Sequence, residues 1–117
     1  MIAKKNLLGI EFLEPRDIYE ILDKAKGFTQ QGLSGKSVAQ TLDGHNIINI
    51  FFENSTRTQT SFEIAGKRLG ALVTSINVKD SSIKKGETLF DTALTLNAMK
   101  PDLIVIRHPY SGAVQLL

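Results

Sequence analysis

Three short apolar runs alternate with longer segments of helical spacing, and this alternation constrains the fold more than any other feature. The runs cover residues 47–53, 71–78 and 103–106. They are short and rich in β-branched or aromatic residues, which is typical of strands covered on both faces of a parallel sheet. Helical spacing separates the runs, so the order is βαβαβ. We therefore predict an α/β fold, a parallel sheet with right-handed crossovers and helices on both faces.

Helical segments are predicted from residue 15 to about 31, after the polar break at 54–58, over 87–100, and from 113 onward. Pro15 suits a first helical turn, Gly70 a helix end, and Pro101 a stop. In each of the first three predicted helices, one face is expected to carry the periodic residues. These are Ile18, Ile21, Leu22, Ala25 and Phe28 in the first helix, Phe62, Ala65 and Leu69 in the second, and Phe90, Ala93, Leu94 and Asn97 in the third.

Charge and cysteine content exclude several classes of function. The chain has 14 Lys and Arg against 12 Asp and Glu, spread along its length, and no cysteine. Nonspecific electrostatic binding to nucleic acid or to a membrane is therefore not supported, and the charge content leaves a small acidic ligand open. Disulfides and cysteine-ligated zinc are excluded, and no metal cluster is visible. No stretch approaches a membrane span or a signal peptide, so we expect a cytoplasmic protein.

Cationic and hydroxyl side chains follow each predicted strand. The ligands of such sheets bind outside the carboxyl ends of the strands, where the segments 54–58, 79–86 and 107–112 would meet. These segments contain Ser55, Thr56, Arg57, Thr58, Ser81, Ser82, Lys84, Lys85, Arg107 and His108. The sequence therefore predicts a cationic, hydroxyl-rich edge that suits an anion.

The three segments differ in how strongly they indicate binding. Segment 54–58 joins a buried strand to a helix, so backbone N–H groups and the Arg57 guanidinium can converge on phosphate oxygens. The alternative is that Ser55 or Thr56 only caps the helix while Arg57 is solvated, and the residues alone leave this open. For segment 79–86, a solvated charged loop is the favoured alternative. His108 is either a general acid or, as we favour, a hydrogen-bonded loop residue.

These motifs together resemble a known family. Residues 51–58, Phe-Phe-Glu-Asn-Ser-Thr-Arg-Thr, followed by Ser-Phe-Glu at 61–63, resemble the carbamoyl-phosphate motif of the aspartate and ornithine carbamoyltransferases. Residues 84–89, Lys-Lys-Gly-Glu-Thr-Leu, then Asp91-Thr92, and Arg-His-Pro at 107–109 are similar to the aspartate branch in particular. The resemblance covers nearly the whole chain. It implies that residues 1–117 are a carbamoyl-phosphate-binding domain, incomplete at its C-terminal end, from the first third of a longer protein whose aspartate-binding domain is absent here.

The resemblance also implies roles for individual residues. Carbamoyl phosphate would be held by Ser55, Thr56, Arg57, Thr58 and Arg107, of which Arg57, Thr58 and Arg107 would be catalytic. Ser81 and Lys85 would serve the site of an adjacent subunit in a homotrimer with shared active sites, and Ser82 competes with Ser81 for that role. No metal or cofactor is implied.

The implied reaction transfers the carbamoyl group of carbamoyl phosphate to the amine of L-aspartate, giving N-carbamoyl-L-aspartate and phosphate for pyrimidine biosynthesis. Another transferase of the family, such as ornithine carbamoyltransferase, is one alternative. A phosphate-binding and oligomer-contact module that is inactive by itself is the other. The sequence does not decide whether regulatory or dihydroorotase subunits attach.

Overall fold

The computed structural model describes residues 5–30, 41–78 and 88–117, which fall in two compact units, Met1–Val38 and Ala39–Leu117. The first unit contains helix α1 (Pro15–Gln30), which begins at the predicted proline. Asp17 in its first turn accepts a hydrogen bond from the backbone N–H of Glu14 at 3.0 Å. This bond satisfies one of the N–H groups that a helix start leaves without a partner.

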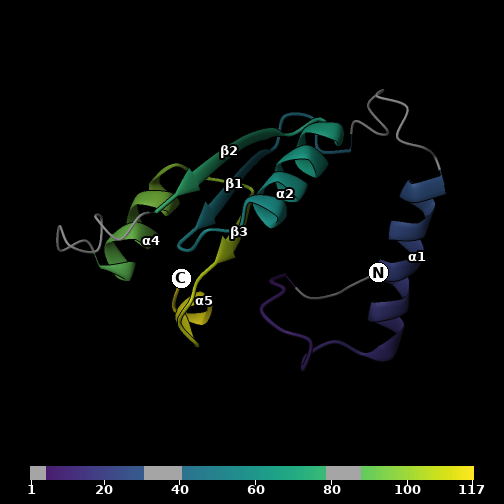
Figure 1. The fold of residues 1–117 in the computed structure, drawn as a ribbon, viewed down its shortest axis with the longest axis horizontal. Coiled ribbons are helices and arrows are strands. Elements are labelled where there is room, and N and C mark those ends of the chain that lie inside the picture. Colours follow the sequence, from purple (N-terminus) through teal and green to yellow (C-terminus); the bar gives the residue numbers. More distant parts are fainter. Residues whose placement is uncertain (1–4, 31–40, 79–87) are drawn as a thin grey trace. The chain divides into compact units, whose positions relative to one another are not determined.

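The second unit is built around a three-stranded parallel sheet (Figure 1). Its strands are β1 (Asn46–Phe51), β2 (Leu72–Asn77) and β3 (Leu103–Arg107), in the spatial order β2-β1-β3. Helices α2 (Thr56–Arg68), α4 (Leu89–Ala98) and α5 (Ala113–Leu116) complete the unit. The predicted βαβαβ order and parallel sheet are confirmed. Phe51 lies opposite both Asn77 and Arg107, so the carboxyl ends of all three strands meet at one edge.

The central strand β1 is buried on both faces, as its apolar run predicted. On one face Ile48 and Ile50 pack with Leu96 of α4. On the other face α2 approaches so closely that a Cβ added to Gly66 would lie 2.7 Å from a methyl of Val73 and 3.3 Å from one of Ile47. Helices therefore cover both faces of the sheet, and the backbone of α2 comes close to the sheet at Gly66.

Helix boundaries differ from the prediction at the most important segment. Residues 54–58 were expected to form a polar break, but α2 already begins at Thr56. Strand β1 ends at Phe51, before the predicted end at residue 53. The predicted helix stop at Gly70 is confirmed by its positive φ of 88°, which glycine adopts without strain.

The apolar helix faces predicted from spacing are not the faces that pack on the sheet. Phe62 is 46% exposed, Phe90 69% and Leu94 54%, whereas α4 buries Thr92 and Leu96. Spacing identified residues that share a face but not which face turns inward, because that choice depends on the shape of the neighbouring sheet. Strand β3 was predicted to be buried, but Leu103 at its start is 51% exposed, since β3 pairs on one side only in the described part of the chain.

None of the helices in the described ranges is long and apolar enough to cross a bilayer.

Candidate functional site

The N-terminus of α2 lies just beyond the carboxyl end of β1 and presents unpaired backbone donors. Ser55 occupies the N-cap position, but its hydroxyl makes no capping hydrogen bond. Gln59 N–H donates to the carbonyl of Ser55 at 2.9 Å, so the amides of residues 56–58 precede the first helical hydrogen bond. Amides in this position, together with the helix dipole, favour a negative charge. Of the alternative in which Ser55 or Thr56 only caps the helix while Arg57 is solvated, the structure lacks the capping bond from Ser55 but does leave Arg57 exposed.

Arg57 sits in the first turn of α2 with an exposed side chain. Within residues 41–78 and 88–117 it forms no ion pair, so its planar fork of donors is available to a ligand. The hydroxyls of Ser55, Thr56 and Thr58 lie on the same short segment. The predicted anion-binding residues of this segment are therefore all at the start of one helix.

Arg107 reaches the same edge from β3. Its carbonyl accepts a hydrogen bond from the N–H of Phe52 at 2.8 Å, which ties the end of β3 to the residue after β1. Its guanidinium Nε donates to Oε1 of Glu53 at 2.7 Å. The structure thus places Arg107 beside the 52–58 segment, as predicted, but already paired with a carboxylate. Sequence reasoning gave Glu53 no role, although a carboxylate directly after a buried strand was a signal for one.

His108 is held in the loop after β3. Its Nδ1 accepts a hydrogen bond from the backbone N–H of Tyr110 at 3.0 Å. Its ring lies 4.7 Å from the ring of Phe52 and 5.4 Å from that of Tyr110, between centroids. This is the hydrogen-bonded loop residue that we favoured over a general acid.

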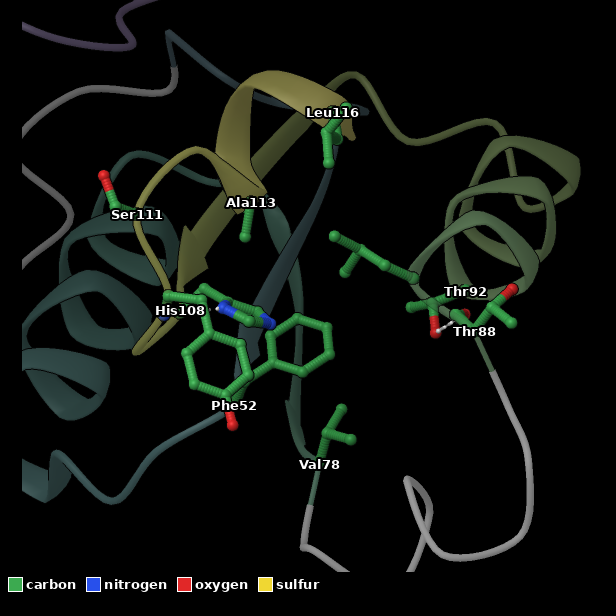
Figure 2. A pocket seen from close by; sticks show the side chains of 10 residues that line it. Phe52, Val78, Thr88, Thr92, His108, Ser111, Ala113 and Leu116 are labelled. Carbon is green, nitrogen blue, oxygen red and sulfur yellow. Dashed lines mark hydrogen bonds between the residues drawn. The ribbon is translucent and has the colours of Figure 1, made fainter.

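A hollow of about 280 Å³ opens beside this aromatic group (Figure 2). It is lined mainly by apolar side chains, among them Phe52, Val78, Leu89, Ala113 and Leu116. No residue of the 55–58 segment lines it. The hollow is therefore distinct from the predicted anion site at residues 55–58, although both lie near the carboxyl edge of the sheet.

Thr88 and Asp91, from the Lys-Gly-Glu-Thr and Asp-Thr motifs, bind each other at the start of α4 and stabilise it. Thr88 Oγ1 accepts from the N–H of Asp91 at 3.0 Å, and Asp91 Oδ2 accepts from the N–H of Thr88 at 3.1 Å. This reciprocal pair is a capping box. The backbone and side-chain hydrogen bonds from Thr88 lower the pKa of Asp91 below its ordinary value.

Ser81, Ser82, Lys84 and Lys85 lie outside the described residues, so their predicted roles stay predictions. In the described ranges no three His, Asp or Glu side chains are grouped so that they could hold a metal ion.

The fold and this edge define a class: an open parallel α/β domain with a helix N-terminus and two arginines at the carboxyl edge of its sheet. Residues 5–117 match the family model described as "Aspartate/ornithine carbamoyltransferase, carbamoyl-P binding domain". The chain belongs to the aspartate/ornithine carbamoyltransferase family.

Individual relatives agree with this assignment. The chain is 59% identical over 115 residues to the aspartate carbamoyltransferase catalytic subunit of Ruegeria pomeroyi, and 58% identical over 117 residues to that of Parvibaculum lavamentivorans. These alignments cover 98% and 100% of this chain but 37% and 36% of the relatives, so the chain spans little more than a third of their length.

Solved structures show the same fold. The catalytic subunit of M. jannaschii aspartate transcarbamoylase matches with a TM-score of 0.83 at 38% identity, covering 97% of this chain and 38% of that one. Aspartate transcarbamoylase from Trypanosoma cruzi, in complex with phosphate, matches with a TM-score of 0.80 at 37% identity, covering 92% and 33%.

Proposed function

We propose that this chain supplies the carbamoyl-phosphate site of an aspartate carbamoyltransferase. The observation that carries the proposal is the uncapped start of α2, with Arg57 in its first turn and Arg107 at the adjacent strand end. The phosphate would bind the amides of residues 55–58 and both guanidinium groups. The hydroxyl of Thr58 and Arg107 would share the carbamoyl oxygen.

In the proposed reaction the amine of L-aspartate attacks the carbamoyl carbon, forming a C–N bond. The carbonyl oxygen carries the charge of the tetrahedral intermediate, which collapses as the C–O bond to phosphate breaks. The amine loses a proton, and the products are N-carbamoyl-L-aspartate and phosphate. Such a step needs positioned cations and oriented N–H groups rather than a nucleophilic side chain. Arg57, Arg107 and the first turn of α2 provide groups of this kind.

The proposal also covers the oligomeric state of the enzyme, its cellular location and its pathway. The enzyme would work in the cytoplasm, in pyrimidine biosynthesis, as a homotrimer in which Ser81 and Lys85 of one chain complete the site of the next. Because this chain spans about 37% of the length of its relatives, we propose that it binds the phosphate while turnover needs further polypeptide.

The direct test is phosphate binding by Arg57→Ala. Losing the charged hydrogen bonds of Arg57 should weaken the binding of inorganic phosphate by about 1.5–3 kcal/mol, which is a roughly ten- to hundredfold loss of affinity. Unchanged affinity in a folded Arg57→Ala protein would show that the site is elsewhere.

Shared sites have a separate test in the whole enzyme. Mixing inactive Arg57→Ala chains with inactive Lys85→Ala chains should regenerate activity, because some interfaces of a hybrid trimer then keep both residues. Hybrids that stay inactive, while wild-type chains survive the same procedure, would place Lys85 in its own chain's site.

A further inference from the structure

Asn49 lies in the middle of the buried central strand, where the pattern calls for an apolar residue. Its neighbours Ile48 and Ile50 are both 2% exposed, and Asn49 itself is 0% exposed. Its Oδ1 is buried and has no hydrogen-bond partner among the described residues. A buried, unpaired acceptor costs stability, so some other gain must account for an asparagine here.

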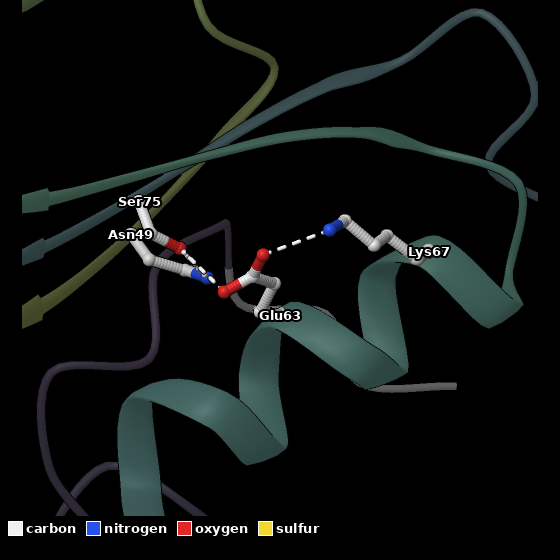
Figure 3. A network of polar contacts seen from close by, with 4 residues as sticks. All are labelled: Asn49, Glu63, Lys67 and Ser75. Atoms are coloured by element: carbon white, nitrogen blue, oxygen red, sulfur yellow. Dashed lines mark hydrogen bonds and ion pairs between the residues drawn. The ribbon is translucent and has the colours of Figure 1, made fainter. Parts of the chain in front are cut away.

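The amide nitrogen of Asn49 begins a chain of hydrogen bonds that crosses from the sheet to α2 (Figure 3). Asn49 Nδ2 donates to Ser75 Oγ at 3.5 Å, and Ser75 Oγ donates to Glu63 Oε2 at 3.3 Å. Lys67 Nζ donates to the other carboxylate oxygen, Oε1, at 2.8 Å.

This series of hydrogen bonds has a fixed direction because it ends on the carboxylate of Glu63, which only accepts hydrogen bonds. The hydrogen bond and the charge of Lys67, and to a smaller extent the bond from Ser75, lower the pKa of Glu63 and keep it ionised. Every donor therefore points toward α2, and the carbonyl of Asn49 is the group left over.

These bonds join three elements at one level of the sheet. Asn49 in β1 and Ser75 in β2 are register partners, and Glu63 comes from α2. Elsewhere α2 meets the sheet at Gly66, which has no side chain to interlock with Ile47 and Val73. The contact at Gly66 sets how closely the helix approaches the sheet. The hydrogen bonds from Asn49 through Ser75 to Glu63 add a directional contact between the helix and the sheet, about one turn before Gly66.

A shift of α2 would move the anion site directly. Glu63 lies seven residues beyond Thr56, about two turns along the same helix. A helix is stiff over that length, so a displacement at Glu63 reaches the first-turn amides at full size. Those amides and Arg57 must converge on one anion together with Arg107, which comes from a different element.

We propose that Asn49, acting through Ser75 and Glu63, is a positioning residue that sets α2 on the sheet so that its first turn faces the bound anion. The inference rests on the proposed function, since it assumes that the anion binds at that turn.

The critical test is Asn49→Leu in the full chain, with inorganic phosphate as the probe. Leucine removes the unpaired carbonyl and keeps the strand apolar, and Ser75, being exposed, can replace the lost donor by water. We expect a urea midpoint equal to or above that of the parent. Phosphate affinity should nevertheless fall about three- to tenfold. A residue with a purely structural role would lower both quantities together or neither.

Ser75 gives a second route that does not disturb the core. Ser75→Ala should lower the affinity for phosphate to a similar extent. Ser75→Thr, which keeps the hydroxyl, should have the affinity of the parent. Amide hydrogen exchange at Gln59, the first amide of α2 that donates a helical hydrogen bond, should be faster in Asn49→Leu and Ser75→Ala than in the parent. Thr74→Ala is the matched control, because Thr74 is the neighbouring exposed residue on the opposite face of β2.

Arg57→Gln separates this inference from the proposed function. Suppose that Arg57→Gln lowers the affinity for phosphate while Asn49→Leu and Ser75→Ala bind phosphate as tightly as Thr74→Ala. The positioning role of Asn49 is then wrong, and the proposed anion site stands. If Arg57→Gln also binds phosphate normally, the site itself is misplaced and the positioning role falls with it. Should Asn49→Leu fail to fold, the Ser75→Ala and Ser75→Thr pair decides the matter alone.

Discussion

Replacing Glu53 with glutamine is expected to strengthen the binding of inorganic phosphate. Arg107 Nε contacts the Glu53 carboxylate at 2.7 Å, so an incoming anion must share that guanidinium or displace its partner. The two side chains are 45% and 37% exposed, so water and salt screen the pair. An ion pair of this kind contributes about 0.2–1 kcal/mol. Relieving the competition, and removing a like charge beside the phosphate, should tighten binding about two- to fivefold.

Isothermal titration calorimetry with phosphate, at low and at high ionic strength, measures this gain. The gain should shrink in high salt, since screening weakens both the ion pair and the repulsion. Asp43→Asn is the matched control because it removes one exposed carboxylate before the start of β1, at the opposite edge of the sheet. If Glu53→Gln bound phosphate more weakly than Asp43→Asn, Glu53 would orient Arg107 for the anion rather than compete with it, and this reasoning would be refuted.

Three further predictions concern stability. Gly66→Ala should lower the free energy of unfolding by about 1–3 kcal/mol, because its Cβ would collide with stiff side chains of the sheet, whereas Gly27→Ala, with nothing within 4 Å, should be neutral or stabilising in urea unfolding. Thr88→Ala removes the cap of α4 and should cost about 0.5–2 kcal/mol by the same measurement, with Thr95→Ala, an exposed threonine within α4, as the control. Because the folded-state pKa of Asp91 is lowered, its contribution to stability is present above its unfolded pKa and is lost as pH falls through the folded value. Acid unfolding curves should therefore be shallower for Asp91→Asn, and identical curves would show that the capping box does not stabilise the fold.

The sequence by itself determined the elements and the edge of the sheet where the proposed site lies. Local spacing and the apolar runs depend on residues within a turn or two of each other, so they identified the strands, the βαβαβ order and the helix stop at Gly70. Since parallel strands end at one edge, chain connectivity alone placed the start of α2 and Arg107 at the same edge of the sheet.

Only the tertiary structure decided which side chains meet across that framework. The Glu53–Arg107 pair joins residues 54 positions apart, and the Asn49–Ser75 bond joins residues 26 apart. No local pattern encodes these partners, because they depend on strand order and register. The inward face of α2 was likewise decided at Gly66, where the close approach of the sheet excludes a side chain. Periodicity records which residues share a face, but a face turns inward only when the surface opposite fits it.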